Sequence, residues 1–76
     1  MENKLIEVMS IVFDVPLDAI NENTSPDNLE KWDSLSQLQL IIAIEDTFNI
    51  KLEDEDIEKL SDFKSIKQII NKKIDK

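Results

Sequence analysis

Apolar residues recur near the start of the chain with the spacing of a helix. Four of them lie three or four positions apart within residues 3–13, namely Leu5, Val8, Met9 and Val12. This spacing places them on one side of a helix. Pro16 follows and disfavours helical geometry in the residue before it. The pattern therefore predicts a first helix over residues 3–13.

The longest amphipathic pattern begins at Ser34. Its stripe consists of Leu35, Leu38, Ile41, Ile42 and Phe48, and is widened by Leu40 and Ile44. Because a wider apolar stripe indicates a more enclosed helix, we expect this one to be central and more deeply buried than the first. Asn49 marks its predicted end, since Asn tolerates the left-handed conformation that often closes a helix.

Two shorter patterns complete the chain. Leu52, Ile57 and Leu60 predict a short helix whose first turn is crowded with acids, as the helix dipole favours. A last helix is expected from about Ser65, which has capping-box spacing to Gln68. Its predicted inner face is Ile66, Ile69, Ile70 and Ile74, and its basic end is Lys72, Lys73 and Lys76.

Residues 15–31 show no sustained period. A few apolar anchors, Leu17, Ile20 and Leu29, lie among Asn, Thr, Ser, Pro and Asp. We predict a long ordered loop, and loops of this length in compact domains tend to be functional. The expected fold is all-α: a four-helix bundle of three longer helices and one short helix, with the long loop between the first and second helices.

Composition supports one small helical domain. The chain has 76 residues, of which 41% are hydrophobic, with no glycine and two prolines. This favours helices over a turn-rich β fold, and the length predicts a single domain over residues 1–76. The sequence contains neither cysteine nor histidine, so disulfides and the usual zinc sites are excluded and no metal site is expected.

Charge is unevenly distributed. The net charge is −8, with −11 on residues 1–60 and +3 on residues 61–76. A phosphate backbone would be repelled, so nucleic acid is not an expected partner. The acidic region is either a solvated surface or a docking surface for basic partners. No membrane-length apolar run or secretory leader is recognisable, and we expect a cytoplasmic monomer.

Ser34 is the residue whose role the local pattern leaves open. Ser34 and Gln37 have the spacing of a capping box, although Asp33 could equally be the cap and leave Ser34 exposed in the first turn. A hydrolytic nucleophile is disfavoured, because no histidine or glycine-rich elbow accompanies the serine. A third possibility is modification, since a helix N-terminus favours an attached phosphate.

The run DSLSQLQLIIAIEDTFNIKLEDEDIEKL resembles the acyl carrier proteins, and the likeness extends from Asp33 to about Ile70. The resemblance implies that Ser34, beside Asp33, receives 4′-phosphopantetheine from coenzyme A through a phosphopantetheinyl transferase. The arm ends in a thiol, so the cofactor supplies the chemistry and the protein supplies position. A carrier of this kind is not itself an enzyme.

The resemblance also implies two further sets of residues. Loading and transferring enzymes with basic patches would dock on Leu35, Ile42, Glu45, Asp46, Glu53, Asp54, Glu55 and Asp56. A growing acyl chain would slip between the helices among Ile44, Leu52, Ile57, Leu60 and Ile66, although the residues by themselves are also those of an ordinary packed core.

Trp32 departs from the common family pattern, because the serine is preceded by EKWDS without a glycine. The W-D-S-L form resembles discrete carriers of specialised pathways, and the tryptophan could also simply anchor the loop. Two alternatives to an acyl carrier stay open: an acidic helical interaction module in which Ser34 only caps a helix, and a carrier of aminoacyl groups.

Overall fold

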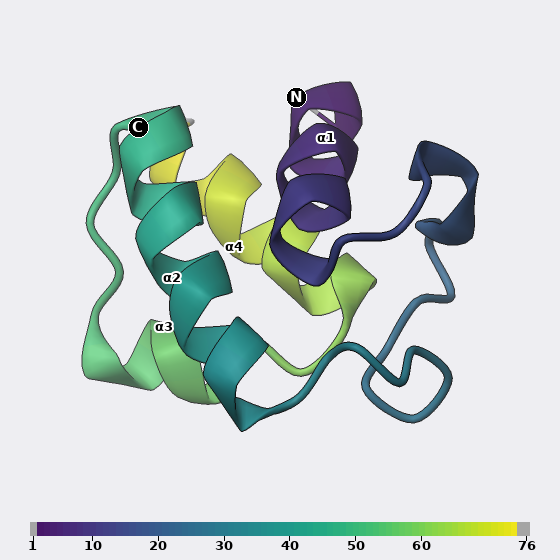
Figure 1. Ribbon diagram of the computed structural model, residues 1–76. Coiled ribbons are helices and arrows are strands. Elements are labelled where there is room, and N and C mark those ends of the chain that lie inside the picture. The colour runs from purple at the N-terminus through teal and green to yellow at the C-terminus, as the bar shows by residue number, and fades with distance from the viewer. Residues whose placement is uncertain (1, 75–76) are drawn as a thin grey trace.

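A computed structural model describes residues 2–74, which form four α-helices and one 3-10 helix. In chain order these are α1 (Glu2–Phe13), η1 (Leu17–Ala19), α2 (Ser34–Phe48), α3 (Asp54–Glu58) and α4 (Phe63–Ile74). The all-α class and the predicted set of three longer helices and one short helix are confirmed (Figure 1). Lys76, predicted at the basic end of the last helix, lies outside the described residues.

The helices enclose one apolar core. α1 packs against α2, and α4 crosses behind both in the view of Figure 1. The largest fully buried side chains come from α1, α2 and α4: Phe13, Phe63, Leu5, Met9, Leu40, Ile44, Ile66 and Ile70. Within residues 2–74, no helix has the length and apolar character needed to cross a membrane.

The buried face of α2 differs from the predicted stripe. Leu40, Ile41 and Ile44 are buried together with Ser36, whereas Leu35, Leu38 and Ile42 are 67%, 60% and 68% exposed. α2 has apolar residues on two adjoining stripes, and periodicity alone cannot say which of them meets the neighbouring helices. With four buried positions among fifteen, against four among twelve in α1, α2 is not the more buried helix.

Smaller corrections concern α1 and α4. Phe13 is the buried residue at the end of α1, while Val12 is only half-buried. α4 starts at Phe63 rather than near Ser65, because the Asp62 carboxylate accepts a hydrogen bond from the Ser65 backbone N–H at 2.8 Å. That bond, followed by one from the Ser65 side chain, holds the pKa of Asp62 below its ordinary value of 3.8. The predicted capping box of Ser65 and Gln68 is therefore wrong. Ile74, placed on the inner face, is half exposed.

Two helices end in left-handed residues that are not glycine. Asn49 has φ 54° and ψ 50° at the end of α2, as the sequence predicts. Asp14 has φ 56° after α1, where the Val15 N–H reaches the Ser10 carbonyl at 3.1 Å. Because the chain contains no glycine, Asp and Asn take the conformation that other side chains tolerate poorly.

The segment between α1 and α2 is an ordered loop, as predicted, and it also contains η1. Thr24 is buried in it, and its carbonyl accepts a hydrogen bond from the Phe63 N–H at 3.0 Å, which ties the loop to the start of α4. Of the predicted anchors, Ile20 is buried and Leu29 is half-buried, but Leu17 is exposed. The loop swings away from the helices and returns to the start of α2 (Figure 1).

Lysines of α4 pair with acids of the other elements. Lys67 Nζ lies 2.7 Å from Glu2 of α1 and 3.4 Å from Glu22 of the loop. Lys73 Nζ lies 2.8 Å from Asp56 of α3. Two lysines of the basic C-terminal segment are thereby paired with acids of α1, the long loop and α3.

Replacing Lys73 by methionine should lower the melting temperature at neutral pH, because Asp56 is buried and would lose its cation. The Lys73 ammonium, followed by the Glu53 backbone N–H, lowers the pKa of Asp56 from 3.8, and Asp56 raises the pKa of Lys73 from 10.5. The pair thus stabilises the fold between those two values. Its contribution is lost as pH falls through the lowered pKa of Asp56 or rises through the raised pKa of Lys73.

The measurement is the melting temperature of wild type and Lys73→Met as a function of pH. The difference between them should be largest near neutrality and should vanish in strong acid and strong base. Lys72→Met is the matched control, since Lys72 is exposed on the same turn. An equal loss in both variants, or a difference independent of pH, would contradict the assignment.

Candidate functional site

The turn before α2 is held by reciprocal hydrogen bonds between Asp33 and Ser36. The Asp33 carboxylate accepts from the Ser36 N–H at 2.9 Å, and the Ser36 hydroxyl accepts from the Asp33 N–H at 2.8 Å. The same hydroxyl donates to the Lys31 carbonyl at 2.8 Å. The bond from the Ser36 N–H, followed by the Ser36 side chain, lowers the pKa of Asp33 below 3.8. Asp33 is therefore the ionised N-cap of α2.

Ser34 is the first residue of α2, and it is exposed. The predicted capping box of Ser34 and Gln37 is wrong, since Asp33 and Ser36 form the box instead. Among residues 2–74, the hydrogen bonds of this turn use Asp33 and Ser36, and none uses the Ser34 hydroxyl. The Ser34 hydroxyl is consequently free to face solvent at the positive end of the α2 dipole.

Trp32 packs into the core directly before the turn and holds it in place. Its ring is buried, with 4% of its surface exposed, and it packs on Phe13 with ring centroids 5.1 Å apart and an interplanar angle of 31°. The indole N–H donates to the Gln37 side-chain oxygen at 2.6 Å, and the Gln37 amide nitrogen donates to the Leu60 carbonyl at 3.1 Å. Trp32 thus anchors the end of the long loop, as the sequence suggested for a lone tryptophan.

A shallow groove of 330 Å³ opens beside Ser34. Its walls come from the loop, the turn, α2 and the connection after α3: Pro26, Trp32, Asp33, Ser34, Gln37 and Leu60. The only ionisable group among them is Asp33, whose carboxylate already caps the helix. None of the other residues that line the groove supplies a base that could activate the Ser34 hydroxyl.

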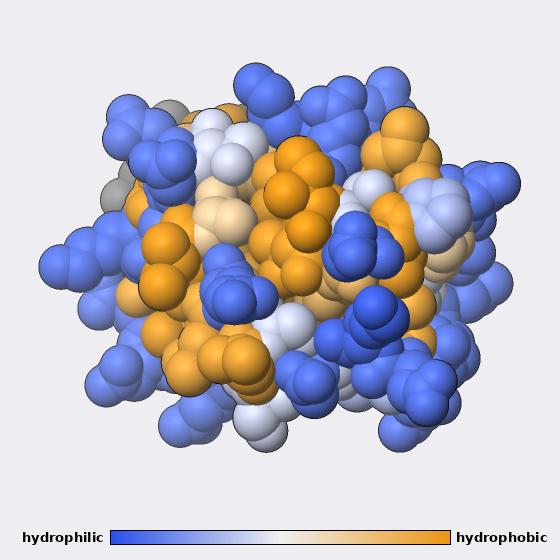
Figure 2. Space-filling model, in the orientation of Figure 1, coloured by the Kyte–Doolittle hydropathy of each residue, from blue (hydrophilic) through white to orange (hydrophobic). Residues whose placement is uncertain are grey.

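An exposed apolar row runs along α2 from this turn. Leu35 and Ile42, two residues of the predicted partner surface, lie in it, and Leu38 lies between them. Figure 2 shows apolar side chains exposed over α2 and between α2 and α1, on a surface that is otherwise mostly hydrophilic. Leu38 is absent from the predicted partner surface, because its spacing fits the core stripe equally well. Its three-residue spacing from Leu35 is the signal that could have found it.

The acidic residues of the predicted partner surface fall into two groups. Asp56 is buried, with 8% of its surface exposed, and bonds Lys73 and the Glu53 N–H, so its prediction as a partner contact is corrected. Glu45 is half-buried, and its carboxylate accepts from the Leu52 N–H at 2.9 Å, which pins the α2–α3 connection. The other four are exposed: Asp46, Glu53, Asp54 and Glu55.

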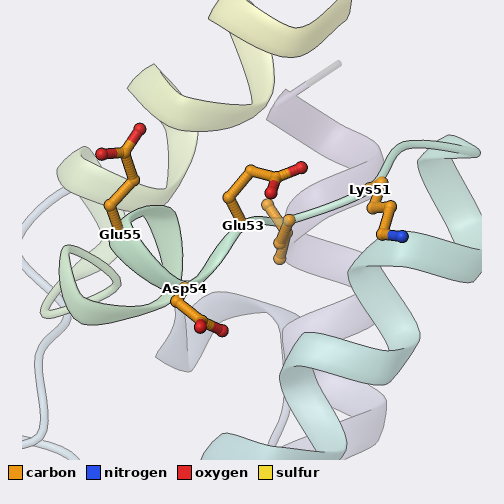
Figure 3. A pocket seen from close by; sticks show the side chains of 5 residues that line it. Lys51, Glu53, Asp54 and Glu55 are labelled. Atoms are coloured by element: carbon orange, nitrogen blue, oxygen red, sulfur yellow. The ribbon is translucent and has the colours of Figure 1, made fainter.

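The exposed acids of α3 border a hollow of 480 Å³ that is lined by residues 51–55. Figure 3 shows Glu53 and Glu55 projecting to one side of the segment and Asp54 to the other. These carboxylates do not converge on one point, and within residues 2–74 no group of three or more acids could hold a metal ion. The hollow is therefore a charged surface of α3.

The five residues predicted to receive an acyl chain lie in or against the core. Ile44 and Ile66 are fully buried, Leu52 and Leu60 are nearly so, and Ile57 is half-buried and packs against the same cluster. Leu60 also lines the groove beside Ser34. The fold thus brings these residues together and places one of them at the serine.

Comparisons with known proteins identify the family to which the chain belongs. The family described as "Phosphopantetheine attachment site" matches residues 3–71. The acyl carrier protein of Buchnera aphidicola subsp. Schizaphis graminum (strain Sg) is 40% identical over 73 residues, which cover 95% of this chain and 92% of that protein. The solution NMR structure of the holo acyl carrier protein from Geobacter metallireducens has a similar fold, with a TM-score of 0.85, 27% identity, and coverage of 99% of this chain and 88% of that one. The chain therefore belongs to the phosphopantetheine attachment family, among the acyl carrier proteins.

Proposed function

We propose that Ser34 is the residue that receives the phosphopantetheine arm, and that the chain presents acyl groups from it to partner enzymes. The observation that carries this proposal is the free, exposed hydroxyl on the first residue of α2, in a turn whose own hydrogen bonds are made by Asp33 and Ser36. When bound, the arm supplies a thiol, on which acyl groups are carried as thioesters.

The modification needs an external enzyme. The Ser34 oxygen forms a bond to the phosphorus next to the pantetheine of coenzyme A, the pyrophosphate bond breaks, and adenosine 3′,5′-bisphosphate leaves as the serine proton is removed. Within residues 2–74 the ionisable group lining the groove at Ser34 is Asp33, whose carboxylate already caps the helix, so a phosphopantetheinyl transferase performs this step. The chain itself is a carrier rather than an enzyme.

Partner enzymes dock on the exposed side of α2 and α3. The row of Leu35, Leu38 and Ile42 supplies an apolar centre, and Asp46 follows Ile42 by one helical turn. Glu53, Asp54 and Glu55 add exposed negative charge on α3. Transferases and acyl-processing enzymes with basic patches would be attracted to this surface and oriented on it.

The extent of the domain and the pathway are part of the same proposal. Buried residues of α1, α2, α4 and the long loop share one core cluster, against which Ile57 of α3 also packs, and this supports a single carrier domain over residues 1–76. Trp32, in place of the usual glycine-containing turn, supports a discrete carrier of a specialised or fatty-acid-like biosynthetic pathway. An acyl rather than an aminoacyl cargo is favoured by the similarity to acyl carrier proteins.

Incubation with coenzyme A, magnesium and a broad-specificity phosphopantetheinyl transferase should increase the mass of the protein by one phosphopantetheine group. Ser34→Ala should not gain mass, because it lacks the accepting oxygen. Ser36→Ala is the matched control and should still be modified. The readout is intact-protein mass spectrometry, and an equal mass gain in Ser34→Ala would overturn the assignment.

The same two serines should separate modification from stability. Ser36→Ala removes the bonds to Asp33 and Lys31 and should cost about 1 kcal/mol of unfolding free energy. Ser34→Ala removes no hydrogen bond of the turn and should change the free energy by less than about 0.5 kcal/mol. Urea unfolding measures both values. A larger loss of unfolding free energy in Ser34→Ala than in Ser36→Ala would mean that Ser34 caps α2.

Reversing the exposed charge of Asp46 should slow modification about threefold to tenfold at low ionic strength, because attraction to basic partners is lost. The difference between Asp46→Lys and wild type should shrink as salt is added. Glu7→Lys is the control, since Glu7 is an exposed acid on α1 outside the proposed surface. Equal slowing by Asp46→Lys and Glu7→Lys would show that modification depends on the net charge of the protein and not on the position of Asp46.

A further inference from the structure

Gln37 joins the end of the long loop to the connection between α3 and α4 across the Ser34 groove. It is half-buried, accepts from the Trp32 indole at 2.6 Å and donates to the Leu60 carbonyl at 3.1 Å. Trp32 is held in turn by its packing on Phe13. The amide is therefore fixed at both ends, with its oxygen on the loop side and its nitrogen on the connection between α3 and α4.

The Gln37–Leu60 bond lies between the groove and the core. Gln37 and Leu60 both line the groove, and the side chain of Leu60 belongs to the same buried cluster as Ile44 and Ile66. The positions one turn after Gln37, Leu40 and Ile41, are buried in that cluster too. A chain that passed from Ser34 between Gln37 and Leu60 toward these residues would displace the Gln37 amide and break its bonds to Leu60 and Trp32.

The other hollow that reaches an acyl-pocket candidate is a poorer route. It touches Leu52, but its remaining lining is Lys51 and the acids Glu53, Asp54 and Glu55. An apolar chain would cross charged surface there (Figure 3). The groove at Ser34, with Trp32, Pro26 and Leu60 in its walls, is the more apolar path.

We propose that Gln37, held by Trp32, is a gate that sets the shortest acyl chain able to leave the groove and enter the core. This inference rests on the proposed attachment at Ser34. Short acyl groups stay in the groove and remain available to solvent and partners. Longer chains enter only when the methylene groups that they bury outweigh the two hydrogen bonds that opening breaks.

The effect of the gate on the chain-length threshold can be predicted in carbon atoms. The net value of one protein hydrogen bond is close to the gain from burying one or two methylene groups. Removing both bonds of Gln37 should therefore lower the chain-length threshold by about two to four carbon atoms. Gln37→Met is the suitable substitution, because methionine has a similar length and apolar volume but makes neither bond.

The test uses acyl-coenzyme A thioesters from butyryl to dodecanoyl, which the transferase attaches together with the arm. For each variant, the melting temperature of every acylated form is compared with that of its own holo form, so that a change in basal stability cancels. The half-life of the thioester in hydroxylamine is the second readout, because a chain drawn into the core shields its carbonyl. The threshold is the shortest chain at which both values rise.

The expected result is a lower threshold in Gln37→Met than in wild type, including the case in which wild type shows none up to dodecanoyl. Gln39→Met is the matched control and should behave as wild type, because Gln39 is exposed and two positions along a helix point away from each other. Equal thresholds in wild type and Gln37→Met, or none in either, would overturn the gate.

A second variant tests how the gate is held. Trp32→Phe keeps an aromatic ring beside Phe13 but cannot donate to Gln37, so its threshold should fall part of the way toward that of Gln37→Met. An unchanged threshold would overturn the role assigned to Trp32. Mass spectrometry separates these outcomes from failure at Ser34: absence of any acylated product contradicts the proposed function, whereas acylated protein with unshifted thresholds contradicts only the gate.

Discussion

The reciprocal hydrogen bonds between Asp33 and Ser36 are the interaction on which the functional end of this protein depends. These bonds satisfy free backbone N–H groups at the start of α2 without using the side chain of Ser34. Ser34 is consequently the exposed first residue of a fifteen-residue helix rather than its cap. The buried Trp32 directly before the turn fixes the direction from which the chain enters it. Rigidity beside the hydroxyl and freedom of the hydroxyl itself follow from the same two bonds.

Charge in this chain divides into structural and free groups, and the division follows from where α4 lies. Lys67 and Lys73 draw Glu2, Glu22 and Asp56 into ion pairs, and the backbone of the α2–α3 connection occupies Glu45. The acids that stay exposed are spread over the molecule: Asp46 lies on α2, Asp54, Glu55 and Glu58 lie on α3, and others lie on α1 and in the long loop. The docking surface that we propose on α2 and α3 therefore combines an exposed apolar row with exposed acids.

Periodicity predicted where the helices are more reliably than which way they face. The ends of α1 and α2 were predictable, because Pro16 and Asn49 act through local backbone geometry. The buried side of α2 was not, since Leu35, Leu38 and Ile42 are as apolar as Leu40, Ile41 and Ile44. The caps of α2 and α4 were assigned wrongly, because the pairs Ser34–Gln37 and Ser65–Gln68 have the spacing of capping boxes. In the structure the carboxylates of Asp33 and Asp62 accept the backbone N–H groups instead, and a charged acceptor binds them more strongly.

The sequence by itself determined the helical class, the order of the elements and the long loop, because these follow from composition and local periods, and its motif of adjacent residues singled out Ser34 as the candidate site. Tertiary structure alone decided which apolar stripe of α2 stays exposed, which acids are occupied, and that Gln37 spans Trp32 and Leu60. These outcomes depend on contacts between residues distant in sequence. The free energy of such contacts is set by how the helices pack, which no local pattern encodes.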